Sequence, residues 1–180
     1  MQRIRINGIK DVILWVVLPI FFVAILVLLD QLTKFWFSNL YKSQGNTVFI
    51  RGVLSFTYTV NTGSAFSFLA GKSWAQIFFK VITCFALIAF VGAYLYALIN
   101  RYKTLSVSTV LIFSGTVGNF IDRLLYNGVT DFIKFDFISF PIFNFADILL
   151  TFGVIFFIVH FFFLDESAIF KKTEKNSEAK

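Results

Sequence analysis

The chain has 180 residues, of which 58% are hydrophobic and only 14% carry a charge, and its mean hydropathy is +0.80. This composition excludes an ordinary water-soluble domain. The formal net charge of +6 does not indicate a nucleic-acid-binding protein, because the basic residues gather at the ends of apolar segments. A single cysteine, Cys84, excludes an internal disulfide.

Four segments without a charged residue are long enough to cross a membrane, at 12–29, 81–100, 104–121 and 148–164. A helix of about 18 residues rises about 27 Å, close to the thickness of the hydrocarbon core of a bilayer. We therefore expect one membrane all-α domain over 1–180, with a small β element and four transmembrane helices. The expected helices lie at about 12–30, 74–100, 104–123 and 145–165.

The basic residues predict the orientation of these helices. They precede the first helix, separate the second from the third and follow the fourth, which places them all on one side of a four-pass chain: Arg3, Arg5, Lys10, Arg101, Lys103, Lys171, Lys172 and Lys175. By the positive-inside rule both termini are cytoplasmic and the two longer connections are external. No small-residue cleavage site follows the first apolar segment, so we expect it to be retained as a helix.

The external connections carry the β-forming residues. The first, at about 35–73, contains β-branched and aromatic runs at 47–50 and 55–60, which predict a small sheet on the membrane surface. The second, at about 124–144, begins with a short strand or loop at 129–133. The aromatic run after it is expected to lie along the membrane interface.

Charged residues beside the apolar segments are the candidate functional groups, because a carboxylate next to hydrocarbon is costly. Asp30 and Lys34 are four apart on one helix face, which indicates an interfacial ion pair or a brace for a catalytic loop. Asn119, Asp122 and Arg123 line one helix face, where we expect a local charge network with a structural role for Asp122.

Asp131 and Asp147 are the candidates for chemistry. Asn144 followed three residues later by Asp147 is typical of a helix start, which accounts for that acid by capping alone. Capping does not explain why Asp131 also lies near the membrane. We interpret the two as a catalytic pair at the outer edge of the membrane. His160 has no second candidate ligand nearby, so we expect a packed side chain and no metal site.

Five motifs resemble those of a known family. They are DQLTK, NTGSAF, GTVGNFIDR, GVTDF and FNFAD. In this order, over about 12–164, they are similar to the five motif regions of the lipoprotein signal peptidases (signal peptidase II), which are bacterial aspartic membrane proteases. The family fold has four transmembrane helices and a small external β-structure, which agrees with the helices and the sheet predicted from the residues.

The resemblance implies that Asp131 and Asp147 form the catalytic dyad. It implies that the substrate backbone is bound by Asn61, Asn119, Arg123 and Asn144. The supporting residues that it implies are Asp30, Lys34, Asp122, Gly63, Val129 and Ala146. No cofactor or metal is implied.

The resemblance also implies the substrate, a membrane-anchored prolipoprotein whose cysteine carries a diacylglyceryl group and which is cut just before that cysteine. The expected setting is the bacterial cytoplasmic membrane, with the site at its outer face, membrane phospholipids as neighbours and the chain as a monomer. Two other functions are kept as alternatives. One is an ion-coupled transporter, which predicts acids near the middle of the bilayer. The other is a non-catalytic membrane assembly factor whose acids serve only as caps.

Overall fold

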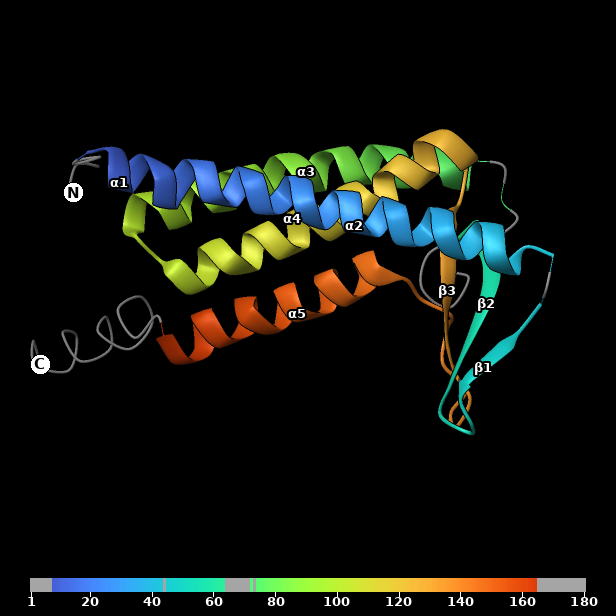
Figure 1. Ribbon diagram of the computed structural model, residues 1–180. Helices are drawn as coiled ribbons and strands as arrows, with labels where there is room; N and C mark the ends of the chain where they lie inside the picture. Colours follow the sequence, from blue (N-terminus) through green and yellow to red (C-terminus); the bar gives the residue numbers. More distant parts are fainter. Residues whose placement is uncertain (1–7, 44, 64–71, 73, 165–180) are drawn as a thin grey trace, which may run out of the picture.

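The computed structural model describes residues 8–43, 45–63, 72 and 74–164. Within them, four helices are long and apolar enough to cross a membrane, and they run side by side with a small sheet at one end (Figure 1), which confirms the predicted fold class. The first span comprises α1 (Ile9–Val12), the π-helical turn η1 (Ile13–Val17) and α2 (Leu18–Tyr41). The others are α3 (Ala75–Asn100), α4 (Lys103–Tyr126), and α5 (Phe145–Val159) with the π-helical turn η3 (His160–Leu164).

Helix α4 is the centre of the bundle. Half of its most apolar window is buried, against 22% for the window of the span that contains α5 and 6% for the other two. Small residues allow this packing: a Cβ added at Gly115 would lie 2.5 Å from the carbonyl oxygen of Ala146. Ser108 donates a hydrogen bond of 2.8 Å to the carbonyl of Gly153. Close approach of backbones through small and hydroxyl residues is the usual way in which membrane helices associate.

The first helix is longer than the sequence predicts, because it continues to Tyr41 instead of ending near Asp30. Its 33 residues span about 50 Å, well beyond a hydrocarbon core of about 30 Å. The last turns are stabilised by the sheet: the ring of Phe37 stacks on Phe132 at 4.3 Å and packs against Phe56 at 4.7 Å. This tertiary packing explains why a segment that reads as an external connection is helical.

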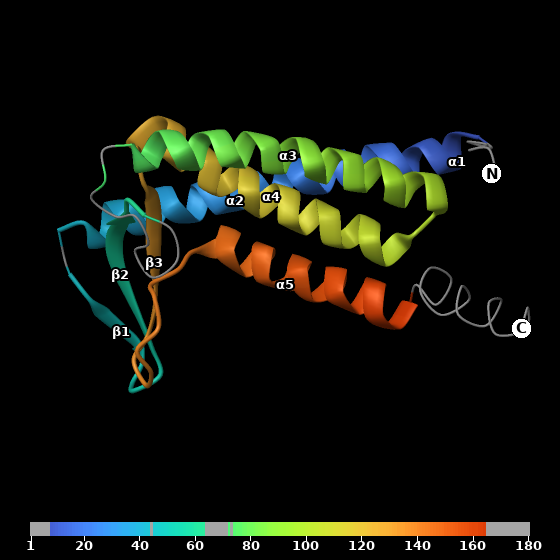
Figure 2. The ribbon, with the colours of Figure 1, turned by 180° about the vertical axis from the view of Figure 1, so that it is seen from behind.

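The sheet is antiparallel, in the order β1 (Thr47–Ile50), β2 (Leu54–Asn61), β3 (Val129–Phe135). It extends sideways from the end of the bundle, across the direction of the helices (Figures 1 and 2). β1 and β2 come from the first predicted external connection and β3 from the second. In the register, Thr59 pairs with Asp131 and Asn61 with Val129, which places Asn61 and Asp131 on one face as diagonal neighbours.

The opposite end of the bundle holds the start of α1, the connection between α3 and α4, and the end of η3 (Figure 2). There Arg101 forms an ion pair of 3.0 Å with Asp11. His160 is buried, with its ring 4.8 Å from that of Tyr102, which agrees with a packed side chain. The predicted basic residues 3, 5, 171, 172 and 175 lie outside the described residues, as does the second half of the NTGSAF motif.

Candidate aspartate site

Asp131 and Asp147 are brought together at the end of the bundle that carries the sheet. Asp131 lies in β3 and Asp147 in the first turn of α5. The connection between them folds back on β3: Ile133 donates 2.8 Å to the carbonyl of Phe143, which donates 3.0 Å in return. This antiparallel bridge brings Asn144, the cap of α5, alongside the strand.

Asn144 contacts both aspartates. Its side-chain oxygen accepts from the backbone N–H of Asp147 at 3.1 Å, and the Asp147 carboxylate accepts from the backbone N–H of Asn144 at 3.1 Å. This reciprocal capping box confirms the predicted helix start. The Nδ2 of Asn144 donates to Oδ1 of Asp131 at 2.6 Å. The fully buried amide therefore fixes the position of one carboxylate relative to the other.

Two more asparagines complete the frame. Asn119 of α4 donates from Nδ2 to Oδ1 of Asp147 at 2.9 Å. Asn61, the last residue of β2, donates from Nδ2 to Oδ2 of Asp131 at 3.2 Å, and its own oxygen accepts from the N–H of Gly63 at 3.0 Å. Each carboxylate thus accepts a hydrogen bond on each of its two oxygens.

Asp30 and Lys34 form a buried ion pair beneath this frame. Their side chains are 0% and 3% exposed and the pair is 2.9 Å long. The predicted pair therefore exists, but its helix face is covered by other parts of the bundle and is not open to the surroundings. A buried pair needs further hydrogen bonds to offset the loss of hydration. Gln31 supplies one from Nε2 to Asp30, at 3.1 Å.

Asp122 belongs to the same cluster. The predicted charge network exists, but its cation is Lys34, whose Nζ lies 3.6 Å from Oδ2 of Asp122. Gln31 also donates to Asp122 at 3.1 Å. The adjacent Arg123 points elsewhere, because neighbouring residues on a helix are about 100° apart.

The two buried acids anchor the backbone next to the dyad. Asp122 accepts from the N–H of Thr130 at 2.8 Å, and Asp30 accepts from the N–H of Ala146 at 2.9 Å. Thr130 directly precedes Asp131, and Ala146 directly precedes Asp147. The charged cluster therefore fixes the backbone from which the two carboxylate side chains extend.

Arg123 stands beside the dyad with its guanidinium carbon 5.4 Å from the ring centre of Phe79. Nη1 donates to the carbonyl of Asn119 at the long distance of 3.5 Å. Its Nε is buried and has no hydrogen-bond partner among the described residues. A buried donor without a partner is costly, which makes it a candidate contact for a carbonyl group of a ligand.

A cavity of about 660 Å³ opens beside both carboxylates. One part is polar and includes the dyad with Asn61, Asn119 and Arg123. The other part is apolar and is formed by Val129, Phe135, the 140–143 segment and residues of α5. Such a cavity suits a ligand with a polar centre and an apolar flank. Within the described residues, no cluster of three or more His, Cys, Asp or Glu side chains is placed to hold a metal ion.

Burial, and to a lesser extent the nearby Asp147, raise the pKa of Asp131 from 3.8 to about 7. The amides of Asn144 and Asn61 oppose this shift because they donate to the ionised form. Asp131 therefore carries a proton in about half of the molecules at pH 7.

Sequence reasoning missed three residues of the site. Gln31 bridges the two buried acids, Thr130 offers its backbone N–H, and Gly118 leaves room for Asp30, whose carboxylate would collide with a Cβ there. Only Gly118 left a signal in the sequence, as a glycine inside a helix that needs close packing. The role of a backbone N–H has no sequence signal.

Comparison with known proteins agrees with these features. The sequence profile of the family described as signal peptidase (SPase) II matches residues 22–163. A lipoprotein signal peptidase of Streptococcus pyogenes serotype M5 (strain Manfredo) is 43% identical over 140 residues, which cover 75% of this chain and 86% of that protein. The corresponding protein of serotype M3 (strain SSI-1) is 42% identical over 140 residues, with the same shares of each chain covered.

Two solved structures have the same fold. Both are described as a bacterial membrane enzyme structure determined by the in meso method, one at 2.3 Å and the other at 1.9 Å resolution. The first is 35% identical with a TM-score of 0.73, covering 85% of this chain and 91% of that one. The second is 35% identical with a TM-score of 0.71, covering 83% of this chain and 95% of that one. The chain belongs to the signal peptidase II family.

Proposed function

We propose that Asp131 and Asp147 are the catalytic pair with which this membrane peptidase removes the signal peptide from prolipoproteins. The observation that carries the proposal is the shared amide frame, in which Asn144 donates to Asp131 at 2.6 Å and forms a reciprocal capping box with Asp147. Two carboxyl groups held so close share a proton, since both do not ionise readily together.

The surroundings of the two carboxyl groups support different roles. Asp147 lies in the first turn of α5, where the N-terminal end of the helix dipole favours a negative charge. The raised pKa of Asp131 favours its protonated form up to about pH 7. Asp147 is then the base and Asp131 the acid, as in other aspartate dyads that run acid and base chemistry together.

The reaction is a hydrolysis without a covalent enzyme intermediate. Asp147 takes a proton from a water whose oxygen forms a bond to the scissile carbonyl carbon, while the proton on Asp131 polarises the carbonyl oxygen. The tetrahedral intermediate then breaks its carbon–nitrogen bond, and the leaving nitrogen takes up a proton from the pair. The amide frame keeps both carboxyl groups in place through these steps.

Asn61, Asn119 and Arg123 line the same cavity and are proposed to bind the backbone of the substrate. The buried Nε of Arg123, which has no partner among the described residues, supports a contact with a backbone carbonyl. The apolar part of the cavity supports a substrate that carries lipid on its cysteine, because both the peptide and its acyl chains must reach the site from the membrane.

We propose the bacterial cytoplasmic membrane as the setting, with the site at the outer face. Lys10 belongs to α1, and Arg101 and Lys103 lie where α3 ends and α4 begins. These parts are at the end opposite the sheet (Figure 2), which by the positive-inside rule supports a cytoplasmic location for that end. The position of the dyad at one end of the bundle favours a peptidase over a transporter, whose proton sites are expected near the middle of the bilayer.

The test is cleavage by the purified protein in lipid vesicles. One prolipoprotein is supplied with and without the diacylglyceryl group on its cysteine, and the products are identified by mass spectrometry. We expect a cut just before the cysteine of the lipidated form and little or no cleavage of the other form. Failure to cleave the lipidated form would contradict the proposed function.

A further inference from the structure

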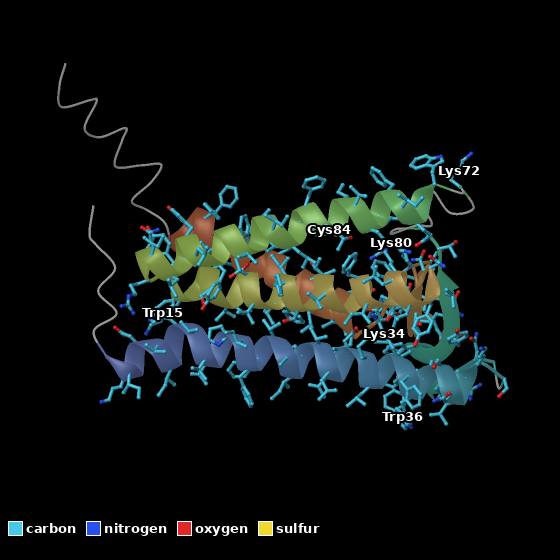
Figure 3. The ribbon with its side chains drawn as sticks, turned by 90° about the horizontal axis from the view of Figure 1, so that it is seen from above. Trp15, Lys34, Trp36, Lys72, Lys80 and Cys84 are labelled. Carbon is cyan, nitrogen blue, oxygen red and sulfur yellow. The ribbon has the colours of Figure 1, made fainter. Side chains whose placement is uncertain are left out.

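Lys34 is the cation at the centre of the buried polar cluster. Its ammonium group contacts Asp30 at 2.9 Å, Asp122 at 3.6 Å and Oδ1 of Asn119 at 2.9 Å. Figure 3 shows Lys34 directed from the first helix towards the interior of the bundle, whereas Trp36 points away from it. A lysine that is only 3% exposed and touches neither cavity nor lipid calls for an explanation beyond charge balance.

The chemistry of the contact determines how Asn119 is oriented. An ammonium group has three donors and no acceptor, so only the oxygen of the Asn119 amide is compatible with it. Asn144 also donates to this oxygen, at 3.1 Å. With the oxygen held in this way, the NH₂ group of Asn119 must face the other way, where it donates to Asp147 at 2.9 Å.

Two further contacts extend the influence of Lys34 to the backbone. Its ion-pair partners are the acids that accept the N–H groups of Ala146 and Thr130, the residues directly before the two catalytic candidates. One positive charge therefore stabilises both backbone anchors as well as the amide. Without it, Asp30 and Asp122 would be two buried negative charges facing each other across Gln31.

We propose that Lys34 is a positioning residue for the hydrolysis, which holds Asn119 with its NH₂ group towards Asp147, the carboxylate that acts as the base. The inference rests on the proposed function, since it assigns the role of Lys34 through the dyad. It goes beyond a structural ion pair because it predicts a change in the pH dependence of the reaction.

The charged groups around the dyad determine the direction of that change. They are Lys34 and Asp30 from α2, Asp122 and Arg123 from α4, Asp131 from β3 and Asp147 from α5. Removing the charge of Lys34 leaves this set more negative, and release of Asn119 removes a donor from Asp147. Both effects favour the protonated pair, so the acidic limb of the activity profile moves to higher pH.

The experiment compares Lys34→Met, Lys34→Arg and Lys80→Met with the wild type in vesicles, on the lipidated prolipoprotein, over a range of pH. Lys80→Met is the matched control, because Lys80 also donates to an asparagine oxygen, that of Asn127 at 2.8 Å, but has no contact with the dyad. For Lys34→Met we expect kcat/KM to fall by about 10- to 100-fold, as for loss of a charge-assisted hydrogen bond, with the acidic limb shifted upward. Lys34→Arg should restore the position of the limb, and Lys80→Met should leave it unchanged.

A double-mutant cycle with Asn119→Ala tests whether Lys34 acts through this amide. The shift caused by Lys34→Met should be clearly smaller in the Asn119→Ala background, where only the effect of the lost charge remains, since contacts in one network are not additive. If Lys34→Met does not fold, Asn119→Asp replaces it, because this variant keeps the acceptor for Lys34 but loses the donor to Asp147. It should show the same upward shift.

Two outcomes would overturn the inference. One is a loss of activity with an unmoved acidic limb, in Lys34→Met or in Asn119→Asp, which would leave Lys34 a structural role only. The other is an undiminished shift from Lys34→Met in the Asn119→Ala background. If the wild type is active, either result contradicts only the positioning role of Lys34. A wild type that cleaves nothing would instead contradict the proposed function.

Discussion

The side-chain amide of Asn144 reaches Asp131 at 2.6 Å, although thirteen positions separate the two residues in the chain. The bridge between Ile133 and Phe143 makes this contact possible, because it turns the intervening segment back along β3. The cap of a membrane helix and a residue of an external strand thus form one unit.

Asp131→Asn and Asp147→Asn should each abolish cleavage while the protein remains folded. An asparagine fills the same space but neither accepts a proton from water nor supplies one to the leaving nitrogen. Cleavage of the lipidated prolipoprotein and the melting temperature Tm in detergent are the measurements. Appreciable processing by either purified variant would refute the dyad. If Asp147→Asn also left the function in cells intact, the result would favour the alternative of a non-catalytic assembly factor.

The activity should decline above about pH 7. The pKa of Asp131 is raised from 3.8 to about 7, so this group holds its proton in the folded protein well above the pH at which an unfolded chain loses it. The raised value favours the folded state at low pH, and this contribution is lost as the pH rises through about 7. We expect kcat/KM to fall about tenfold per pH unit well above that point. A rate that stays constant to pH 9 would contradict this assignment.

Asn144→Ser should move the alkaline limb of the profile to higher pH. Serine still caps α5, so the expected loss in the free energy of unfolding is that of the two hydrogen bonds from the amide to Asp131 and Asn119, about 1–3 kcal/mol. Its hydroxyl group is too short to reach Asp131, which loses the amide that lowers its pKa. The pH dependence of kcat/KM measures the shift. Asn144→Ala is the comparison for lost capping, and it should lower Tm more than Asn144→Ser does.

Gly118→Ala should destabilise the bundle and reduce activity. A Cβ at this position would collide with the carboxylate of Asp30 and lie 3.3 Å from the Cβ of Ala146. Overpacking of this kind costs about 1–3 kcal/mol. Gly92→Ala on α3 is the matched control, because nothing lies within 4 Å of a Cβ there, and it should leave Tm unchanged or raise it. Equal Tm values for the two variants would show that the close approach at Gly118 is unimportant.

The sheet should lie against the membrane surface. Phe49 in β1 and Phe137 just after β3 are 64% and 60% exposed, and the sheet extends sideways from the bundle (Figure 1). In a variant whose only cysteine replaces Phe137, with Cys84→Ala, a nitroxide label should contact lipid-soluble oxygen more than a water-soluble nickel reagent. A label at Lys42, an exposed position at the end of α2, should show the reverse. Similar accessibility at both positions would contradict membrane contact.

The sequence predicted the parts of the structure that depend on regular patterns. Uncharged segments of membrane-spanning length revealed the four helices, and the spacing of Asn144 and Asp147 revealed the cap of α5. The strands β1 and β2 followed from their β-branched and aromatic residues. These features are local, so a single sequence contains the information needed to recognise them.

Contacts between distant segments were harder to predict. Asp122 and Arg123 are adjacent, and only the rotation of α4 in the bundle decides which of them meets Lys34. The extension of the first helix to Tyr41 depends on packing of Phe37 against a strand that is far away in the chain. The backbone N–H groups that donate hydrogen bonds to the buried acids occur in nearly every residue, so nothing in the sequence marks the two that are used. The pairing of Asp131 with Asp147 was inferred from two acids beside the membrane and from a family resemblance, and its catalytic role remains a prediction.

The first helix is longer than the hydrocarbon core of a bilayer is thick, and this length affects how the enzyme responds to the thickness of the membrane. The sheet rests on the last turns of this helix, so the distance of the dyad from the opposite lipid surface is fixed by protein and not by lipid. Lipids with longer acyl chains would carry an anchored cysteine further out relative to the dyad, and shorter ones would draw it inward. We therefore expect the rate of cleavage to be highest in lipids of one acyl-chain length.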